Sequence, residues 1–384
     1  MSMAKHRQQS ASRSLRSASA EVKRAGQRRK NGASGRRHIA LALQGGGSHG
    51  AFTWGVLDRL LEEPSLEIVG VSGTSAGAMN AGVLAHGLRD SPAAARQALR
   101  SFWEALGRMP GFATLHGPWM ETSREWHLEN SPFFQWFNFL TQMLSPYQFN
   151  PFNIHPLSSL IRHIDFAALR SDPKAIRVFI GTTNVRTGRR RVFENGELSP
   201  DVLLASACLP LVFQAVKIDG EAYWDGGYTG NPAIIPLYQE TAAPDLIIIG
   251  INPLSRDTLP RTAREIANRI DEISFNSSFM LELSAIAFID QLLDTKAIDP
   301  SRFRPMLLHG IDGGARLGKL GASSKMNSHP AFLRYLYGYG REAADVWLAS
   351  HLHEVGQQST VDLAELVPLR KDYHLGLVTS PCSP

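Results

Sequence analysis

Cysteine is scarce in this sequence, which has only Cys208 and Cys382 among its 384 residues. The two lie far apart and lack metal-ligand spacing, so a disulfide framework is not indicated and a reducing compartment is expected. No motif predicts a metal ion or a cofactor. An apolar run that could span a bilayer is also missing, as is the apolar core of a secretory signal before Arg37. We therefore expect a cytoplasmic protein whose association with any membrane is peripheral.

Positive charge is concentrated at the start of the chain. Residues 1–37 hold eleven Lys or Arg against a single acid, Glu21, whereas the whole chain has a net charge of +5. The segment lacks the apolar residues of a core, so we expect a disordered tail. An anionic membrane surface would attract it by ~1 kcal/mol per basic residue. Nucleic acid would attract the same charges but is not favoured as a partner. A solvated tail without a partner is an alternative, and the composition also resembles an organelle transit peptide.

One turn of the sequence presents a serine between two glycines. Residues 68–72 are a short apolar run that predicts a buried strand, and the small residues from Ala76 onward predict a tightly packed helix. Between them, Gly73-Thr74-Ser75-Ala76-Gly77 is typical of the strained turn called a nucleophile elbow. The start of the helix would favour a developing alkoxide on Ser75. The pattern alone is weak, since an ordinary turn between a strand and a helix also fits it.

A turn earlier in the chain is rich in glycine. Residues 38–43 predict a buried strand and residues 51–61 an amphipathic helix, with Gly45, Gly46 and Gly47 between them. Successive glycines expose backbone N–H groups with no side chain in front, which is the geometry of an anion-binding nest. Loss of one donor to an oxyanion lowers turnover on the order of 10²–10³-fold. The two turns together indicate a serine nucleophile with an oxyanion hole.

The same glycines admit another interpretation. Gly45, Gly47 and Gly50 satisfy the G-x-G-x-x-G pattern of dinucleotide-binding folds. Such folds place an acidic residue at the end of the second strand, where it holds the ribose hydroxyls. Here the only nearby acid, Glu67, stands at the beginning of that strand. A nicotinamide enzyme is therefore disfavoured.

The nucleophile needs a general base. An α/β-hydrolase would follow its serine with an acid and then a histidine, but several strands would precede its elbow, and here the elbow closes only the second. The histidines that could serve as the base of such a triad show no partner motif; they are His309, His329, His351, His353 and His374. Two Asp-Gly-Gly sequences offer alternatives. Asp219-Gly220 predicts a two-residue hairpin turn that delivers Asp225 to a strand end, whereas Asp312 leads into a loop and fits a solvated turn.

Four blocks of the sequence occur in an order that is typical of one family. They are the glycine-rich turn 45–50, the serine elbow 73–77, the segment 205–213, and Asp225-Gly226-Gly227 with Asn231-Pro232 just beyond it. The order resembles that of the bacterial patatin-like phospholipases, over roughly residues 38–235. The runs 145–151 and 324–327 are similar to a bacterial branch of that family.

The resemblance implies a fold and a mechanism. The fold is α/β, a patatin-like three-layer arrangement with a central, mostly parallel sheet between helices. The mechanism is that of a Ser-Asp dyad, in which Ser75 attacks an ester carbonyl, Asp225 takes its proton, and water then hydrolyses the acyl-enzyme. The N–H groups of Gly45, Gly46 and Gly47 are implied to form the oxyanion hole. The substrate would be a lipid or another acyl ester.

One residue departs from the family pattern. Plant-type members carry Arg or Lys where this chain has His49, which we interpret as a polar loop histidine. Two alternatives to a lipid acyl hydrolase stay open. One is a hydrolase or acyltransferase that acts on other esters, and the other is a catalytically weak protein that coats lipid granules or membranes.

The rest of the chain suggests its organisation. We expect a basic tail over 1–37, a catalytic domain over 38–354 and a loosely packed C-terminal end over 355–384. Residues 246–251 predict a buried strand, and residues 261–293 and 332–351 predict long helices.

Aromatic residues gather in one segment, 101–155, which holds thirteen of the thirty-three in the chain. Aromatics at helical spacing usually belong to a core, so most of these are interpreted as core. Phe133, Phe134 and Trp136 are interpreted as residues of a lid or acyl channel that touch lipid.

Overall fold

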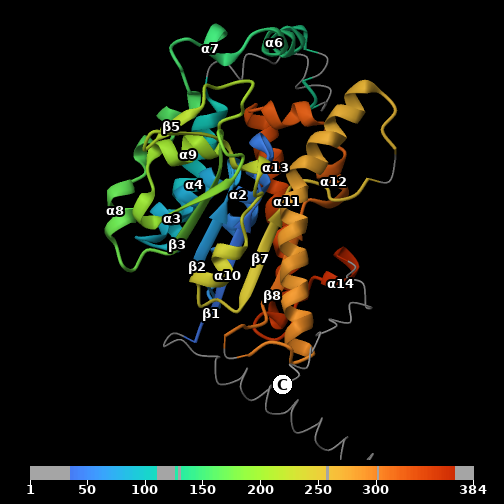
Figure 1. The fold of residues 1–384 in the computed structure, drawn as a ribbon. Helices are drawn as coiled ribbons and strands as arrows, with labels where there is room; N and C mark the ends of the chain where they lie inside the picture. Colours follow the sequence, from blue (N-terminus) through green and yellow to red (C-terminus); the bar gives the residue numbers. More distant parts are fainter. Residues whose placement is uncertain (1–34, 110–125, 129–130, 257–258, 301, 368–384) are drawn as a thin grey trace, which may run out of the picture.

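The computed structural model of the chain (Figure 1) describes residues 35–109, 126–128, 131–256, 259–300 and 302–367. Nearly all of the predicted basic tail and the last part of the predicted C-terminal end lie outside the described residues. Within them, no helix has the length and apolar character needed to cross a bilayer.

An eight-stranded sheet runs through the middle of the molecule in the order β5-β6-β3-β2-β1-β7-β8, with β4 paired to β3. The strands that pair in parallel are β1 (Arg37–Leu43), β2 (Leu66–Gly73), β3 (Arg177–Asn184), β7 (Asp245–Gly250) and β8 (Leu307–Asp312). The antiparallel pairings are made by β4 (Arg190–Glu194), β5 (Val216–Ile218) and β6 (Glu221–Asp225). Strands buried on both faces are near-continuous apolar runs, as β1 and β7 are. The predicted mostly parallel sheet is thus confirmed.

Helices cover both faces of the sheet, because successive side chains of a strand point to opposite sides. Leu41 and Ile247 belong to a core with the helices of one face, whereas Ala42 and Leu246 belong to a core with the helices of the other. The first face is covered by α2 (Gly50–Leu60), α3 (Ala76–Leu88), α4 (Pro92–Gly107) and α13 (Pro330–His351). The second is covered by α10 (Ile235–Glu240) and α11 (Ala263–Asp294). This is the three-layer fold that was predicted.

The remaining helices are short or lie at the ends of the sheet. They are α6 (Pro132–Met143), α7 (Pro146–Phe149), α8 (Phe166–Ser171), α9 (Pro200–Ser206), α12 (Gly314–Gly318) and α14 (Leu363–Leu366). Residues 355–367, from the predicted C-terminal end, contact β8, because the N–H groups of Thr360 and Val361 donate to the carbonyl of Leu308 at 2.9 and 3.2 Å.

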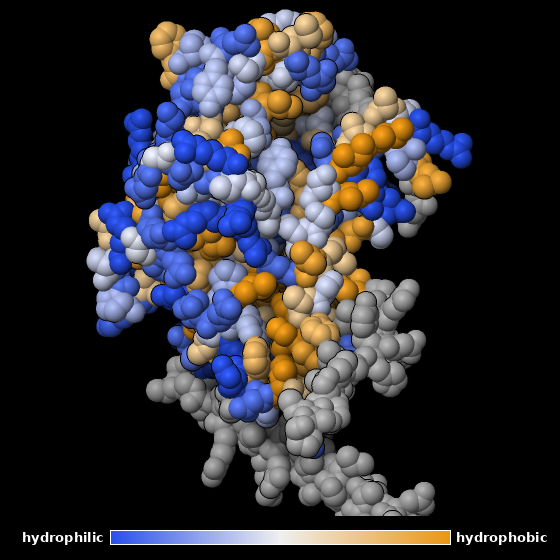
Figure 2. Space-filling view, in the orientation of Figure 1, coloured by the Kyte–Doolittle hydropathy of each residue, from blue (hydrophilic) through white to orange (hydrophobic). Residues whose placement is uncertain are grey.

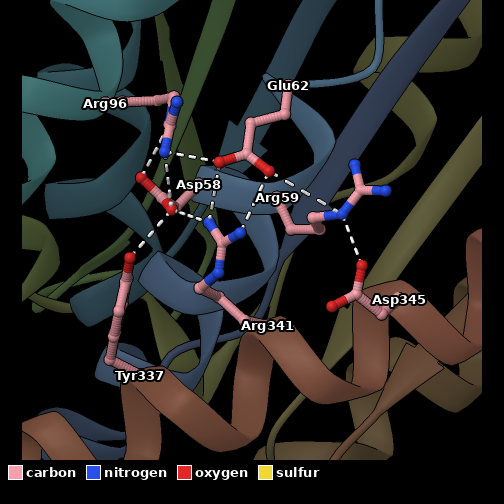
Figure 3. Close-up of polar contacts among 7 residues, drawn as sticks. All are labelled: Asp58, Arg59, Glu62, Arg96, Tyr337, Arg341 and Asp345. Carbon is pink, nitrogen blue, oxygen red and sulfur yellow. Dashed lines mark hydrogen bonds and ion pairs between the residues drawn. The ribbon is translucent and has the colours of Figure 1, made fainter.

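A cluster of charged side chains joins α2, α4 and α13 (Figure 3). Asp58 of α2 is 1% exposed and accepts hydrogen bonds from Arg96 Nε at 2.9 Å and from the Tyr337 hydroxyl at 2.8 Å. Arg341 pairs with Asp58 and also with Glu62, at 3.0 Å. Burial raises the pKa of Asp58, but these hydrogen bonds outweigh it and leave the pKa below its ordinary value. These partners offset the cost of burying the charge of Asp58. The cluster therefore holds α13 against α2.

The aromatic segment is only partly core. Phe102 and Trp103 are buried, as predicted, but the core interpretation is wrong for most of the other described aromatics, which are exposed or only half-buried. The exposed ones are Trp136, Phe139, Tyr147 and Phe152. The reason is that α6 and α7 project beyond the end of the sheet, at the top of Figure 1, where neither helical layer covers their outer side. The side chain of Phe133 lies outside the described residues.

Candidate active site

The two predicted turns meet at the carboxyl edge of the parallel strands β1 and β2, the edge at which α/β folds place their ligands. The contact is close: a Cβ atom added to Gly45 would lie 2.8 Å from the Cβ of Ser75 and 2.6 Å from the carbonyl oxygen of Thr74. No side chain fits between the turns, and this is the physical reason for glycine at position 45. The glycine-rich turn and the serine therefore form one site.

Ser75 adopts the strained conformation of an elbow. Its φ is 55° and its ψ −120°, a backbone conformation that a residue with a side chain rarely adopts. A Cβ atom on Gly73 would lie 2.3 Å from the carbonyl oxygen of Gly77, so the glycine at position 73 is what lets the turn close so tightly. Ser75 is also the residue that precedes α3, where backbone N–H groups give a partial positive charge. Strain of this kind persists only where the surroundings enforce it.

The pairing of β3 explains how Asp225 comes to this edge. β4 pairs with β3 along one side, and β2 pairs with the other side until Gly73 stands opposite Ile180. Two residues further along β3, Thr182 pairs with Asp225 of β6. β4 still pairs with β3 at Thr182, where Thr182 stands opposite Arg191. β6 must therefore pair with the other side of β3, the side that β2 occupies up to Gly73. Asp225 therefore occupies the place that residue 75 would take if β2 continued straight.

The carboxylate of Asp225 is fully buried. Its Oδ1 accepts the N–H of Gly227 at 2.8 Å, while its Oδ2 has no hydrogen-bond partner among the described residues. Burial raises the pKa of Asp225 to about 6, against the opposing effects of the Gly227 N–H and the Ser75 hydroxyl. Ser75 is thus near enough to favour the charged carboxylate, although its hydroxyl makes no hydrogen bond of ordinary geometry to Oδ2. A free carboxylate oxygen beside a hydroxyl can accept its proton.

The segment 205–213 connects the serine to the aspartate. The hydroxyl of Ser206 accepts the N–H of Ser75 at 3.0 Å, and the carbonyl oxygen of Cys208 accepts the N–H of Asp225 at 2.8 Å. In the sequence, only the resemblance to a family pointed to this block. Its two hydrogen bonds show that it fixes the backbone of both Ser75 and Asp225.

The glycine-rich turn does not present all three predicted donors. The N–H of Gly45 donates to Oδ1 of Asn231 at 2.6 Å, and the carbonyl of Gly45 accepts from Nδ2 of Asn252 at 2.7 Å. Gly45 is therefore bound on both sides and its N–H is not free for an oxyanion, which corrects the prediction for this residue. The N–H groups of Gly46 and Gly47 make no hydrogen bond to the described residues. Gly46 is half-buried and Gly47 exposed, so both remain open to a ligand.

His49 is not a polar loop histidine. It is 2% exposed, its Nε2 lies 2.7 Å from the hydroxyl oxygen of Ser324, and its ring meets the ring of Phe332 edge-on. Burial, aided by the charge of Lys325, lowers the pKa of His49 to about 3. The side chain is therefore neutral and supports the turn from beneath.

A lysine that the sequence did not assign also lies against the turn. The ammonium of Lys325 donates to Oδ1 of Asn252 at 2.8 Å, and a Cβ atom on Gly47 would lie 2.3 Å from the Lys325 carbonyl oxygen. Burial lowers the pKa of Lys325, while the charges of Glu272 and Asp271 oppose that effect. Lys325 and Asn252 thus anchor the turn from the C-terminal half of the chain. Only the resemblance of the run 324–327 to a bacterial branch pointed to this segment.

The other candidate bases lie elsewhere. His309 of β8 is buried and bonded to Oδ1 of Asp245 at 2.9 Å. Asp312 is exposed at the end of the same edge strand, and its Oδ1 accepts the N–H of Gly314 at 2.7 Å, which is the solvated turn that was predicted. None of the described histidines has a hydrogen bond to Ser75, and His374 lies outside the described residues.

A serine elbow and a glycine-rich turn at one edge of a three-layer α/β sheet define the class of site. The chain belongs to the Patatin-like phospholipase family, because the model of this family matches residues 41–238, just over half of the chain. The predicted resemblance is thereby confirmed, and membership supports a lipid-hydrolase function. A search of curated proteins found no match.

Solved structures similar to the chain include VipD and the ExoU–SpcU complex. VipD from Legionella pneumophila is 14% identical, with 86% of this chain and 72% of that chain covered and a TM-score of 0.39. The heterodimeric ExoU–SpcU complex from the type III secretion system of Pseudomonas aeruginosa is 17% identical, with 82% and 59% covered and a TM-score of 0.26. These scores are low, so the family assignment rests on the match over residues 41–238.

Proposed function

We propose that the protein is a serine lipid acyl hydrolase of the phospholipase A type, which cleaves carboxylic ester bonds of lipids with Ser75 and Asp225. One observation carries the proposal: the fully buried carboxylate of Asp225, one of whose oxygens has no partner among the described residues, stands beside an elbow serine and the glycine-rich turn. Family membership supplies the substrate class. No cofactor enters the proposed reaction.

The acylation step follows from this geometry. The Ser75 oxygen attacks the ester carbonyl carbon while its proton passes to Oδ2 of Asp225. The carbonyl oxygen becomes an oxyanion, and we assign the N–H groups of Gly46 and Gly47 to hold it. When the tetrahedral intermediate collapses, the alcohol leaves with the proton from Asp225 and the acyl group stays on Ser75. Deacylation repeats the sequence, with water in place of the serine hydroxyl.

The raised pKa of Asp225 suits this role. A carboxylate of ordinary pKa is a poor base at neutral pH, whereas efficient general bases have a pKa nearer the working pH. Burial brings the pKa of Asp225 to about 6, so that the group is ionised at neutral pH yet more basic than an exposed carboxylate. No histidine is needed between the two residues.

The decisive experiment is covalent labelling. A fluorophosphonate probe should label the purified protein at Ser75, and Ser75→Ala should abolish both the labelling and the hydrolysis of a short-chain nitrophenyl ester. Ser101→Ala, which alters an exposed serine of α4, is the matched control and should change neither. Labelling at a different residue, or hydrolysis that survives in Ser75→Ala, would reject the proposal.

A further inference from the structure

One long segment of the chain carries no charge. Residues 131–161 contain no Asp, Glu, Lys or Arg, although these residues make up 20% of the sequence. The segment spans α6, α7 and the connection that follows. Its histidine, His155, is buried, and burial lowers the pKa of His155 to about 4, so it is neutral at neutral pH as well. Surfaces that face water on all sides are normally rich in charge, which makes this gap unusual.

The uncharged segment is also apolar on its outer side. Trp136 and Phe139 of α6 are 55% and 62% exposed. The exposed large hydrophobic residues of the segment are Trp136, Phe139, Met143, Leu144, Tyr147, Phe152 and Ile154, and we call this set the apolar cap. In Figure 2 the corresponding end of the molecule, at the top, shows hydrophobic residues at the surface among hydrophilic ones. Exposed polar residues such as Gln135 and Asn138 lie between the residues of the cap, but none of these carries a charge. So many large apolar side chains exposed in one short segment mark a site of interaction.

The apolar cap lies at the active-site end. Figure 1 places α6 and α7 beyond the carboxyl edge of the parallel strands. Phe134 of α6 packs against Leu128, and so does Met326, the neighbour of Lys325. Further along the segment, the carbonyl of Asn150 accepts a hydrogen bond from the side chain of Gln214 at 2.8 Å. The cap therefore connects to both sides of the proposed site.

A cavity of about 450 Å³ borders both the uncharged segment and α9. Its lining includes Tyr147 and His155 of the segment and Leu204 of α9, together with the charged residues Asp201 and Lys217. Leu204 belongs to α9, which ends at Ser206. The ring of His155 stacks on that of Phe213, with the centroids 4.1 Å apart.

We propose that the apolar cap docks on the interface of an uncharged lipid membrane, so that Trp136, Phe139 and their neighbours enter the region between head groups and acyl chains. Burying a charge in that region is expensive, and a segment without charge avoids the cost. Tryptophan and tyrosine, both present in the cap, are the side chains that favour this depth. Nucleic acid would require cations, which the segment lacks. The biological purpose of docking rests on the proposed function, since the enzyme must take its lipid ester from a membrane. The experiment that tests docking does not depend on that function.

The experiment measures binding of the full-length protein to vesicles of phosphatidylcholine alone, by flotation at high salt, where screening suppresses attraction through the basic tail. The double variant Trp136→Glu/Phe139→Glu is expected to reduce the vesicle-bound fraction by roughly tenfold or more, because two charges would have to enter the interface. Trp136→Phe/Phe139→Leu should restore binding. Leu281→Glu, at an exposed apolar position of α11, is the matched control and should bind as the unaltered chain does.

Binding and hydrolysis are separable in this design. Ser75→Ala should bind vesicles normally, so a failed proposal of function leaves the docking result intact. Circular dichroism and thermal unfolding establish that the double variant is folded. Docking is overturned if the double variant floats with vesicles as well as the unaltered chain does, or if Leu281→Glu loses as much binding. It is equally overturned if light scattering shows that the cap joins two copies of the chain and that vesicles do not compete.

Discussion

Ser206 joins the backbone of Ser75 to the central sheet. Its hydroxyl accepts the N–H of Ser75 at 3.0 Å and donates to the carbonyl oxygen of Gly181 in β3 at 2.7 Å. Ser206 is fully buried, so water does not compete for its hydrogen bonds in the folded protein. A strained residue keeps its conformation only if its surroundings hold it, and here the hydroxyl at the end of α9 links Ser75 to strand β3.

Ser206→Ala should therefore impair both stability and turnover. The change leaves the N–H of Ser75 and the carbonyl of Gly181 unpaired, which costs about 1–3 kcal/mol in the free energy of unfolding. We expect kcat for a soluble nitrophenyl ester to fall about tenfold, on the scale of losing one positioned group, with KM little changed. Urea unfolding and steady-state kinetics measure the two effects. Ser284→Ala, which removes a serine bonded within α11, is the control, and an effect on KM alone would contradict a positioning role.

The two aspartates should differ sharply. Because Asp225 must be ionised to accept the serine proton, kcat/KM should fall as the pH drops below about 6. Asp225→Asn should lower turnover roughly 10²-fold or more, whereas Asp312→Asn should have almost no effect. Ester hydrolysis measured between mildly acidic and neutral pH tests both statements. The reverse ranking would mean that the wrong acid has been paired with Ser75.

Asp225→Asn should also stabilise the folded protein. Burial raises the pKa of Asp225 from 3.8 to about 6, so the folded state holds this proton more tightly than the unfolded state does. The free energy of unfolding therefore falls as the pH rises from about 4 to about 6, and the loss persists above that range. Asp225→Asn removes this loss, so at neutral pH it should raise the free energy of unfolding by about 3 kcal/mol. Denaturant melts at neutral and acidic pH should show the gain only at the higher value.

The charge of Lys325 should contribute to turnover. Lys325→Met removes the donor to Asn252, and the turn that carries Gly46 and Gly47 loses an anchor. We expect a fall of about tenfold in kcat, the scale of one misplaced donor, and a partial recovery in Lys325→Arg. Because burial lowers the pKa of Lys325, activity of the unaltered enzyme should also decline at alkaline pH. A decline of the same size in Lys325→Met would assign it to another group.

Removal of residues 1–37 tests the proposed electrostatic role of the tail. Binding to anionic vesicles should weaken, because the segment carries eleven basic residues. Hydrolysis of a soluble monomeric ester should stay unchanged, since no proposed catalytic group precedes Gly45. The unaltered chain should also bind less as salt rises, because screening shortens the reach of exposed charges to ~8 Å at physiological ionic strength. Affinity that survives both treatments would reject the tether and leave the apolar cap as the contact.

The sequence predicts features that depend on neighbouring residues and misses those that depend on distant ones. The elbow at Ser75 is a local strand–turn–helix pattern, and the hairpin that ends at Asp225 is signalled by its own two-residue turn. The partner of the Gly45 N–H is Asn231, far along the chain, and no local pattern reveals that this donor is taken. The support from Lys325 is equally remote. Burial of the aromatic segment was misjudged because helical spacing indicates an apolar face without showing what covers it.

The pairing of β1 with β7 means that the N-terminal half of the chain cannot be separated from the C-terminal half without exposing the sheet. The family match ends at residue 238, yet one edge of β1 is completed by β7, and Asp58 in the first helix is held by Arg341 of α13. A chain cut after the match would keep both residues of the proposed dyad but present an open strand edge and a bare apolar face, which favour aggregation. The recognisable signature is thus smaller than the unit that folds. Transplanting the chemistry to another scaffold would require the C-terminal half as well.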